Sequence, residues 1–319
     1  MRAPISLTVR GELLLRRPIE TGRPAYIAAA SGLVRCGDWF YVVADDELHL
    51  GVFPAGRFRP GSVRRLLPGR LPRRAATRKE AKPDFEALAS WPSSPAYPFG
   101  ALLILGSGSR RGRARGAIVG LTPTGRLARA APRALDVSSL YRALARELGV
   151  LNVEGAVIQR DALWLFQRGN DRRGANAMVE LDLAAVRASL ARGGVAPEAV
   201  RSIRKIELGN ERGVPYTFTD ACALPDGRLL ALAVAEDTRD AFADGATLGA
   251  CLCQFDHHNR IAAMTPLSAP AKPEGVAVWS AGHAFEDTVL AFVTDADDPD
   301  VPARLMTARG DAFPGRGRC

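Results

Sequence analysis

The chain has 319 residues, of which 47% are hydrophobic and 24% are charged, and its formal net charge is +9 at pH 7. This length and composition exclude a collagen, a coiled coil and a mainly disordered chain, and they allow a large hydrophobic core. No uninterrupted apolar run approaches the roughly 20 residues that span a bilayer, and Arg10 and Glu12 interrupt the apolar stretch near the start of the chain. We therefore expect a soluble, cytoplasmic protein with no membrane partner.

The cysteines indicate the redox state of the protein, and the basic residues indicate which classes of partner it can bind. Five cysteines are an odd number, and because no export signal is visible, we expect reduced thiols. Of the 43 basic residues 4 are lysines and 39 are arginines, spread over the chain with their densest stretches at 64–82 and 110–115. Aromatic residues are not interleaved with these arginines, so no base-stacking platform is visible. Nucleic acid is therefore not an expected partner, a small anionic or phosphorylated ligand fits the charge, and protein partners stay undetermined.

A long, divergent repeat organises the chain after an N-terminal segment, 5–15, that alternates like a strand. Each repeat begins with an acidic or hydroxyl residue, continues as a small and apolar strand, turns, and enters a second, strongly apolar strand that ends in polar residues. The leading residues are 55, 68, 66 and 54 positions apart, which fits a four-stranded unit with variable loops. These heads of the repeats are Ser31, Glu86, Glu154, Asp220 and Glu274.

Later elements follow the same plan in each repeat. The dipeptide Asp226-Gly227 marks a tight hairpin between the first two strands of the fourth repeat, because glycine supplies the positive φ of such turns. Two segments, 136–149 and 182–192, each begin with a capping aspartate and predict helices in the connections. Third strands are predicted at 117–121, 178–181, 248–255 and 303–307.

Five four-stranded antiparallel units predict an all-β protein, a five-bladed β-propeller that forms a single domain over residues 1–319. Residues 5–15 are expected to complete the last blade as its outer strand, which ties the two ends of the chain together. A six-bladed propeller is the alternative, because the strand-poor region 68–98 can conceal a blade.

The heads of the repeats predict a cation site. The first strand of each propeller blade lines the central channel, so the five heads are expected to face the axis. Four carboxylates near one axis repel one another unless protons, water or a cation compensate them. Ca²⁺ accepts six to eight oxygen ligands in flexible geometry, which makes it the first expectation, with Mg²⁺ or no ion as alternatives. In the competing interpretation, each acid bonds the backbone of a neighbouring blade.

The order Ser, Glu, Glu, Asp, Glu at these spacings resembles the calcium-activated nucleotidases, the soluble apyrase family of five-bladed propellers. Local motifs extend the resemblance: Ser31-Gly32-Leu33 followed by FYVVADD at 40–46, Arg168 after the third aromatic strand, and AVAED at 233–237. The resemblance implies a Ca²⁺ in the channel held by one residue from each blade. Phytase-like esterase and gluconolactonase propellers share Glu-Gly strand heads and are more distant candidates.

Polar residues at the ends of the second strands predict a rim around one channel mouth, where a divalent ion and arginines suit hydrolysis of a phosphoanhydride or phosphoester. The alternatives are a non-catalytic binding platform with a structural cation, a lactonase- or esterase-type propeller, and a rim of ordinary solvated turns. In the hydrolase hypothesis, Asp45 is the general base or a second metal ligand, Arg168 and Arg110 hold phosphate, Glu236 positions water, and Asp46 and Asp237 contact the substrate.

Overall fold

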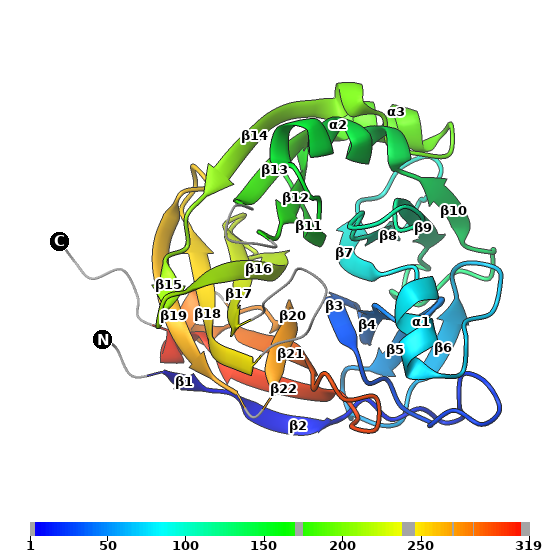
Figure 1. Ribbon diagram of the computed structural model, residues 1–319, viewed down its shortest axis with the longest axis horizontal. Coiled ribbons are helices and arrows are strands. Elements are labelled where there is room, and N and C mark those ends of the chain that lie inside the picture. The colour runs from blue at the N-terminus through cyan, green and yellow to red at the C-terminus, as the bar shows by residue number, and fades with distance from the viewer. Residues whose placement is uncertain (1–3, 170–174, 238–245, 270, 283, 314–319) are drawn as a thin grey trace.

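The computed structural model describes residues 4–169, 175–237, 246–269, 271–282 and 284–313, and it confirms a five-bladed β-propeller of four-stranded antiparallel blades (Figure 1). Blade one contains β3 (Ala30–Cys36), β4 (Trp39–Ala44), β5 (His49–Pro54) and β6 (Ser62–Arg65). Blade two contains β7 (Phe85–Trp91), β8 (Ala101–Gly106), β9 (Arg115–Gly120) and β10 (Arg133–Asp136). Blade three contains β11 (Val153–Gln159), β12 (Ala162–Gln167), β13 (Asn176–Asp182) and β14 (Val200–Ile206).

The last two blades use the N-terminal segment. Blade four contains β16 (Val214–Ala223), β17 (Leu229–Asp237), β18 (Ala246–Phe255) and β19 (Ile261–Ser268), with the two-residue strand β15 (Asn210–Glu211) paired to β16. Blade five contains β20 (Lys272–Ser280), β21 (Val289–Asp295), β22 (Arg304–Arg309) and, as its outer strand, β2 (Thr8–Glu12). A second N-terminal strand, β1 (Ile5–Ser6), pairs in parallel with β19 of blade four.

The second strands of the blades form the centre of the core. Every residue of β8 and β12 is buried, and eight consecutive residues of β17 are buried. A strand of this kind has no polar face, because both of its faces pack against neighbouring blades. The continuous apolar runs in the sequence therefore correspond to the strands that hold the blades against one another.

The N-terminal segment closes the ring by contacting two blades. The β2 strand forms an antiparallel ladder with β22, while the Leu7 amide donates to the carbonyl of Ser268 at 3.0 Å. The Leu13 amide donates to the carbonyl of Ala303 at 2.8 Å, and both leucine side chains are buried. The segment 5–15 is thus divided between blades four and five, where the sequence had suggested one strand in the last blade.

Helices occupy connections at the periphery. In α2 (Ser138–Leu148), the buried stripe of the helix includes Tyr141, whose hydroxyl donates to the carbonyl of Gly106 at 2.7 Å. In α3 (Leu183–Leu190), the capping aspartate accepts a hydrogen bond from the Ala185 amide. Both helices lie in the predicted segments, but the predicted cap of α2 is wrong: Asp136 ends β10 (Arg133–Asp136), and the helix begins after Val137. The other elements are α1 (Ala75–Ala81), which lies in the strand-poor region, and the 3₁₀ turns η1 (Pro197–Ala199), η2 (Phe285–Asp287) and η3 (Gly310–Ala312). No helix in the described ranges is long and apolar enough to cross a membrane.

Candidate functional site

Each innermost strand carries a β-bulge, and the bulge gives every blade one polar residue out of the regular ladder. A bulge inserts an extra residue on one strand, which re-aims its side chain away from the regular ladder. The register shifts fall between Ala30 and Leu33, Phe85 and Ala87, Val153 and Gly155, Phe218 and Asp220, and Pro273 and Gly275. The residues at these bulges are Ser31, Glu86, Glu154, Thr219 and Glu274.

The fourth blade departs from the register expected from sequence. Its extra residue is Thr219, so Asp220 occupies the position that other blades fill with alanine or glycine. The reason for a small residue there is close packing between blades: a Cβ on Gly155 would lie 3.0 Å from the Ala221 amide nitrogen, and a Cβ on Gly275 would lie 2.8 Å from the Ser31 carbonyl oxygen. Asp220 therefore enters the tightest part of the channel.

Asp220 links three blades through backbone amides. Its Oδ2 accepts hydrogen bonds from the amide of Val276 in blade five, at 2.8 Å, and from the amide of Leu33 in blade one, at 3.4 Å. Its side chain is fully buried, and Oδ1 has no hydrogen-bond partner among the described residues. Burial raises the pKa of Asp220 well above its usual range. Asp220 thus bonds the backbone of two neighbouring blades, which is the alternative to cation binding that the sequence left open.

Two substitutions of Asp220 distinguish the effect of its charge from the effect of its hydrogen bonds, because asparagine keeps the acceptor oxygen and alanine does not. A carboxyl with a raised folded-state pKa stabilises the fold below its unfolded pKa and loses that contribution as pH rises through the folded pKa. We therefore expect Asp220→Asn to stabilise the protein by about 1–2 kcal/mol at pH 8 and to have little effect at pH 4. Asp220→Ala is expected to destabilise it by about 2–4 kcal/mol, because two buried amides lose their acceptor. Urea unfolding at both pH values tests this, with exposed Asp38→Asn as the control.

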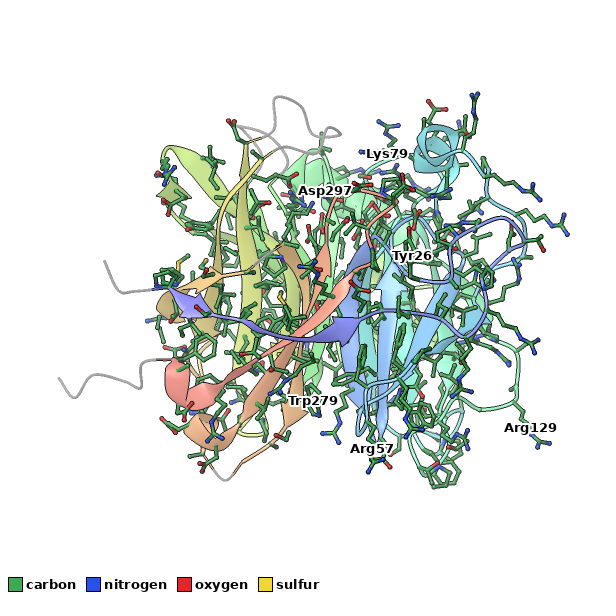
Figure 2. The ribbon with its side chains drawn as sticks, turned by 90° about the horizontal axis from the view of Figure 1, so that it is seen from below. Tyr26, Arg57, Lys79, Arg129, Trp279 and Asp297 are labelled. Atoms are coloured by element: carbon green, nitrogen blue, oxygen red, sulfur yellow. The ribbon has the colours of Figure 1, made fainter. Side chains whose placement is uncertain are left out.

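The bulges and the ends of the second strands meet at one mouth of the channel. Asp45 follows β4, Arg168 follows β12, Glu236 lies near the end of β17, and Asp295 ends β21. Figure 2 shows one of the mouth residues, Asp297, at one end of the propeller, opposite the end where Trp279 lies. The catalytic residues suggested by sequence are therefore brought to a common region.

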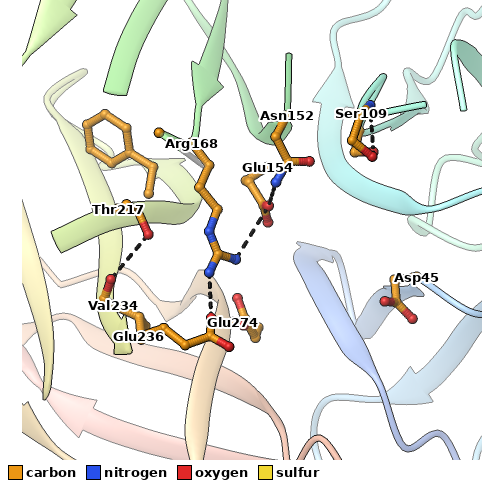
Figure 3. Close-up of polar contacts among 12 residues, drawn as sticks. Asp45, Ser109, Asn152, Glu154, Arg168, Thr217, Val234, Glu236 and Glu274 are labelled. Carbon is orange, nitrogen blue, oxygen red and sulfur yellow. Dashed lines mark hydrogen bonds and ion pairs between the residues drawn. The ribbon is translucent and has the colours of Figure 1, made fainter. Parts of the chain in front are cut away.

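Arg168 connects blades three and four at this mouth (Figure 3). Its guanidinium lies 2.5 Å from Glu236 Oε2 and 3.5 Å from Glu154 Oε1, and the Asn152 amide also donates to that Glu154 oxygen. Although burial alone would lower the pKa of Arg168, the carboxylates of Glu154, Glu274 and Glu236 raise it. Arg168 is thus committed to carboxylates of its own chain, where the sequence hypothesis assigned it to phosphate.

Lys272 forms the second cationic centre. Its Nζ lies 2.8 Å from Asp297 Oδ1, 3.0 Å from Glu274 Oε1 and 3.8 Å from Glu236 Oε1. The side chain is only 7% exposed, so these carboxylates and the ammonium compensate one another away from water. Although burial alone would lower the pKa of Lys272, the carboxylate of Glu274 is the first of several that raise it.

A third cluster lies between blades one and two. Lys82 contacts Asp45 and, at 2.8 Å, Asp84 Oδ1, while Arg113 donates to Asp84 Oδ2 at 2.7 Å. The ligand oxygens of Asp45, Asp84 and Glu86 all lie within 4.8 Å of one another. Within the described part of the chain, this is the group of three acidic, histidine or cysteine side chains close enough to share a metal ion. It contains one of the five predicted ligands, Glu86.

Carboxylates outnumber cations at the mouth. Through ion pairs or direct electrostatic influence, the inner network joins eight carboxyl groups to four cationic side chains, an excess of four negative charges if all are ionised. The cations are Lys82, Arg113, Arg168 and Lys272. The carboxyls are Asp45, Asp84, Glu86, Glu154, Glu236, Glu274, Asp295 and Asp297.

Most of these carboxyls resist ionisation. Burial raises the pKa of Glu154 to about 8 and that of Asp45 to about 6, and it raises the pKa of Glu86 well above its usual range. Asp84 differs: although burial alone would raise its pKa, the ammonium of Lys82 is the first of the groups that hold it below the ordinary value. The mouth therefore favours an added positive charge, whether a proton or a cation.

The predicted substrate-binding residues are more scattered. Asp46 accepts a hydrogen bond from Arg78 at 2.7 Å, so its carboxylate is already compensated. Asp237 is exposed at the end of β17, and Arg110 is exposed in the loop between β8 and β9.

The four described cysteines are free thiols, and Cys319 lies outside the described residues.

Sequence reasoning missed Lys82, Asp84, Thr219 and Lys272. One signal pointed to the lysines: the chain has only four, and two of them stand directly before Pro-Asp or Pro-Glu at the start of a repeat, as Lys82-Pro83-Asp84 and Lys272-Pro273-Glu274. A rare cation two residues before a buried carboxylate indicates a local ion pair. Thr219 carried no comparable signal, because the adjacent aspartate fits the acidic pattern better.

The sheet topology and the polar channel mouth define a five-bladed β-propeller with a charged axial site. A family described as "Family of unknown function (DUF6929)" matches residues 26–309, and the chain belongs to this family. No curated protein matches the sequence. Membership in the calcium-activated nucleotidases stays a prediction.

Several solved structures are similar over almost the whole chain. Myxococcus xanthus glutaminyl cyclase has a TM-score of 0.48 and 14% identity, and the alignment covers 96% of this chain and 100% of that one. A luciferin-regenerating enzyme has a TM-score of 0.46, 9% identity and coverages of 96% and 95%. The PQQ-bound aldose sugar dehydrogenase of Streptomyces coelicolor has a TM-score of 0.44, 14% identity and coverages of 95% and 99%. At these identities, the chemistry of this chain must be argued from its own residues.

Proposed function

We propose that this protein is a divalent-cation-dependent hydrolase whose ion, Ca²⁺ first and Mg²⁺ second, binds at the acidic channel mouth. The observation that carries the proposal is the excess of four carboxyl groups over cationic side chains in a buried network. Hard divalent cations prefer carboxylate oxygens, and an ion bound here relieves the mutual repulsion of these groups.

The ion would be held by Asp45, Asp84 and Glu86, whose ligand oxygens are already close together. Lys82 contacts two of these carboxylates and would share them with the ion. Carboxylates from Glu154 and Glu274 stand at bulges around the same axis, so they add to the negative potential. The residues present therefore fit a hard cation and offer no nitrogen or sulfur set for zinc.

The proposed substrate is a phosphoanhydride or phosphoester. A bound divalent ion neutralises phosphate and lowers the pKa of coordinated water. Glu236 is held by Arg168 and faces Lys272, so its fixed carboxylate can accept a hydrogen bond from the attacking water and orient it. Arg168 acts in this scheme as a positioning residue for Glu236, and exposed Arg110 stays the proposed phosphate contact.

Thermal unfolding of chelator-stripped protein titrated with Ca²⁺ and Mg²⁺ tests the ion. At 100 times Kd, a ligand bound only by the native state adds about 2.7 kcal/mol, which raises Tm by about 5 °C in a protein of this size. We expect Glu86→Gln to lose more than half of that rise and Glu147→Gln, on the exposed face of α2, to keep all of it. Hydrolysis of p-nitrophenyl phosphate and of nucleoside di- and triphosphates, with and without the ion, tests catalysis.

A structural cation on a binding platform is the second candidate. Asp84, one of the proposed ligands, is 3% exposed, and Glu236, the proposed water-orienting group, is 9% exposed. This burial favours a structural ion, because substrates need access to the ion. A Tm rise without turnover of any phosphate substrate supports this second candidate against the hydrolase. Equal Tm values with chelator, Ca²⁺ and Mg²⁺ would contradict both.

A further inference from the structure

The positive charge of this protein is concentrated in one sector. Residues 51–150 contain 19 of the 43 lysines and arginines but only 5 of the 34 acidic residues, a net charge of +14 that leaves −5 for the rest of the chain. This segment contains the last four residues of β5 and all of β6, α1, blade two and α2. We call it the basic sector. The arginines are therefore less evenly spread than the sequence first suggested.

The charge of the basic sector lies mostly on the surface. Fourteen of its 19 basic residues are exposed, 13 of them arginines, against three exposed acids, Glu80, Asp136 and Glu147. The two buried arginines of the sector are neutralised by carboxylates at the mouth: Arg78 pairs with Asp46, and Arg113 pairs with Asp84. The exposed arginines thus have few carboxylates of the same sector to compensate them.

The exposed arginines extend from one end of the propeller to the other. Arg73 and Arg74 precede α1, beside the mouth, and Arg111 lies in the neighbouring loop between β8 and β9. At the opposite end, Arg57 and Arg59 lie in the loop between β5 and β6. Figure 2 shows Lys79 of α1 at one end, and Arg57 and Arg129 at the other.

The loop that carries Arg129 is fixed in place. Nη2 of Arg64 donates to the carbonyl oxygens of Arg129 and Ala130, at 3.0 and 2.9 Å. At the mouth end, Arg65 ends β6 and Arg115 begins β9, and both side chains are exposed. Exposed arginines therefore stand at both ends of the basic sector, on loops and strand ends that the sheets of blades one and two support.

We propose that the basic sector binds the phosphate backbone of nucleic acid, independently of any reaction at the channel mouth. A surface as tall as the propeller requires a long polyanion, because a small anion contacts only one end. Planar guanidinium groups match phosphate oxygens bidentately, and phosphate contacts alone give binding that does not depend on base sequence. The densest arginine stretches, 64–82 and 110–115, contain no aromatic residue that could stack on bases, but contact with the phosphate backbone needs none.

An anionic bilayer fits this surface less well. Peripheral membrane proteins combine basic residues with apolar side chains that enter the interface. Among the described residues, the large hydrophobic side chains that are exposed number four, and only Phe99 and Val150 belong to the basic sector. The sector also covers both ends of two blades, whereas a bilayer is flat.

Fluorescence anisotropy with a labelled 30-bp DNA duplex and a 30-nucleotide RNA tests the proposal. We expect binding at 50 mM NaCl that weakens by about 100-fold or more at 200 mM, as counterion release requires for several phosphate contacts. Two triple variants, Arg73/Arg74/Arg111→Gln and Arg57/Arg59/Arg129→Gln, are each expected to weaken binding about tenfold and to reduce the salt slope by about 2. The control, Arg212/Arg260/Arg309→Gln, removes the same charge from blades four and five and is expected to change affinity less than twofold.

Three results would overturn the proposal. The first is no binding of either probe at 50 mM NaCl by protein whose circular dichroism shows it folded. The second is an equal loss of affinity in the control variant, which would assign binding to net charge. The third is binding to vesicles with 30% phosphatidylserine, but not to nucleic acid, at the same salt concentration. None of these results depends on the divalent ion, so they separate this surface from the proposed hydrolase.

Discussion

Deleting residues 1–12 is expected to lower the free energy of unfolding by about 5 kcal/mol or more, a large part of the 5–15 kcal/mol typical of a folded domain. The deletion removes β1 and β2, exposes the edge of β22 and eliminates the buried side chain of Leu7. Burial of one leucine is worth about 1.5–3 kcal/mol, and each lost ladder hydrogen bond adds about 1 kcal/mol. Since β2 leads into blade one and pairs with β22 of blade five, the deletion also removes the strand that closes the ring between the first and the last blade.

Urea unfolding followed by circular dichroism measures this effect, with deletion of residues 1–3 as the control, because it keeps all of β1 and β2. A synthetic peptide of residues 4–13 is expected to restore part of the stability when added in trans. The free edge of β22 predicts concentration-dependent aggregation of the truncated protein. An unchanged urea midpoint would show that the ring does not need this closure.

The fold could be predicted from the sequence because the blades repeat an almost wholly apolar, buried second strand. The apolar runs of β8, β12 and β17 are too uniform for strands with a solvent face, and they recur with similar spacing. The polar heads were visible for the same reason, since a bulge fixes a polar residue one step before the small residue that packs on the next blade. The five-bladed arrangement follows from counting these units.

Only some residues of the candidate site could be predicted from the sequence. Asp220 was predicted to head the fourth repeat because both threonine and aspartate fit the polar first position. Only the pairing of β16 with β17 shows that Thr219, and not Asp220, occupies the bulge. The contact between Arg168 and Glu236 joins residues 68 positions apart, and no local pattern marks it. Ion pairs between blades depend on how the ring closes, which is a property of the whole chain.

Lys272→Met is expected to destabilise the protein by about 3–5 kcal/mol at pH 8, the usual cost of removing one partner from a buried ion pair. Methionine preserves most of the volume of the side chain but leaves Glu274, Asp297 and Glu236 without the ammonium that faces them. Arg168 is already paired with Glu236 and Glu154, so it does not replace all of the lost charge.

The destabilisation is expected to depend on pH with a definite sign. Burial already raises the pKa of Glu274 despite the opposing effect of Lys272, and removing the lysine raises that pKa further. A carboxyl with a raised folded-state pKa stabilises the fold below its unfolded pKa and loses this stabilisation as pH rises through the folded pKa. The difference between Lys272→Met and the unmodified protein should therefore be small at pH 4–5 and grow toward pH 8.

Urea unfolding at pH 4.5, 6 and 8 tests this dependence, and Lys205→Met is the matched control because Lys205 is exposed on β14. A loss in Lys272→Met that is equal at all three pH values would mean that packing, and not charge compensation, is the contribution of Lys272. A divalent ion gives a second readout. If the mouth binds Ca²⁺, removing the positive charge of Lys272 makes the electrostatic potential of the mouth more negative and should increase the affinity for the ion, even though the ion-free protein is less stable.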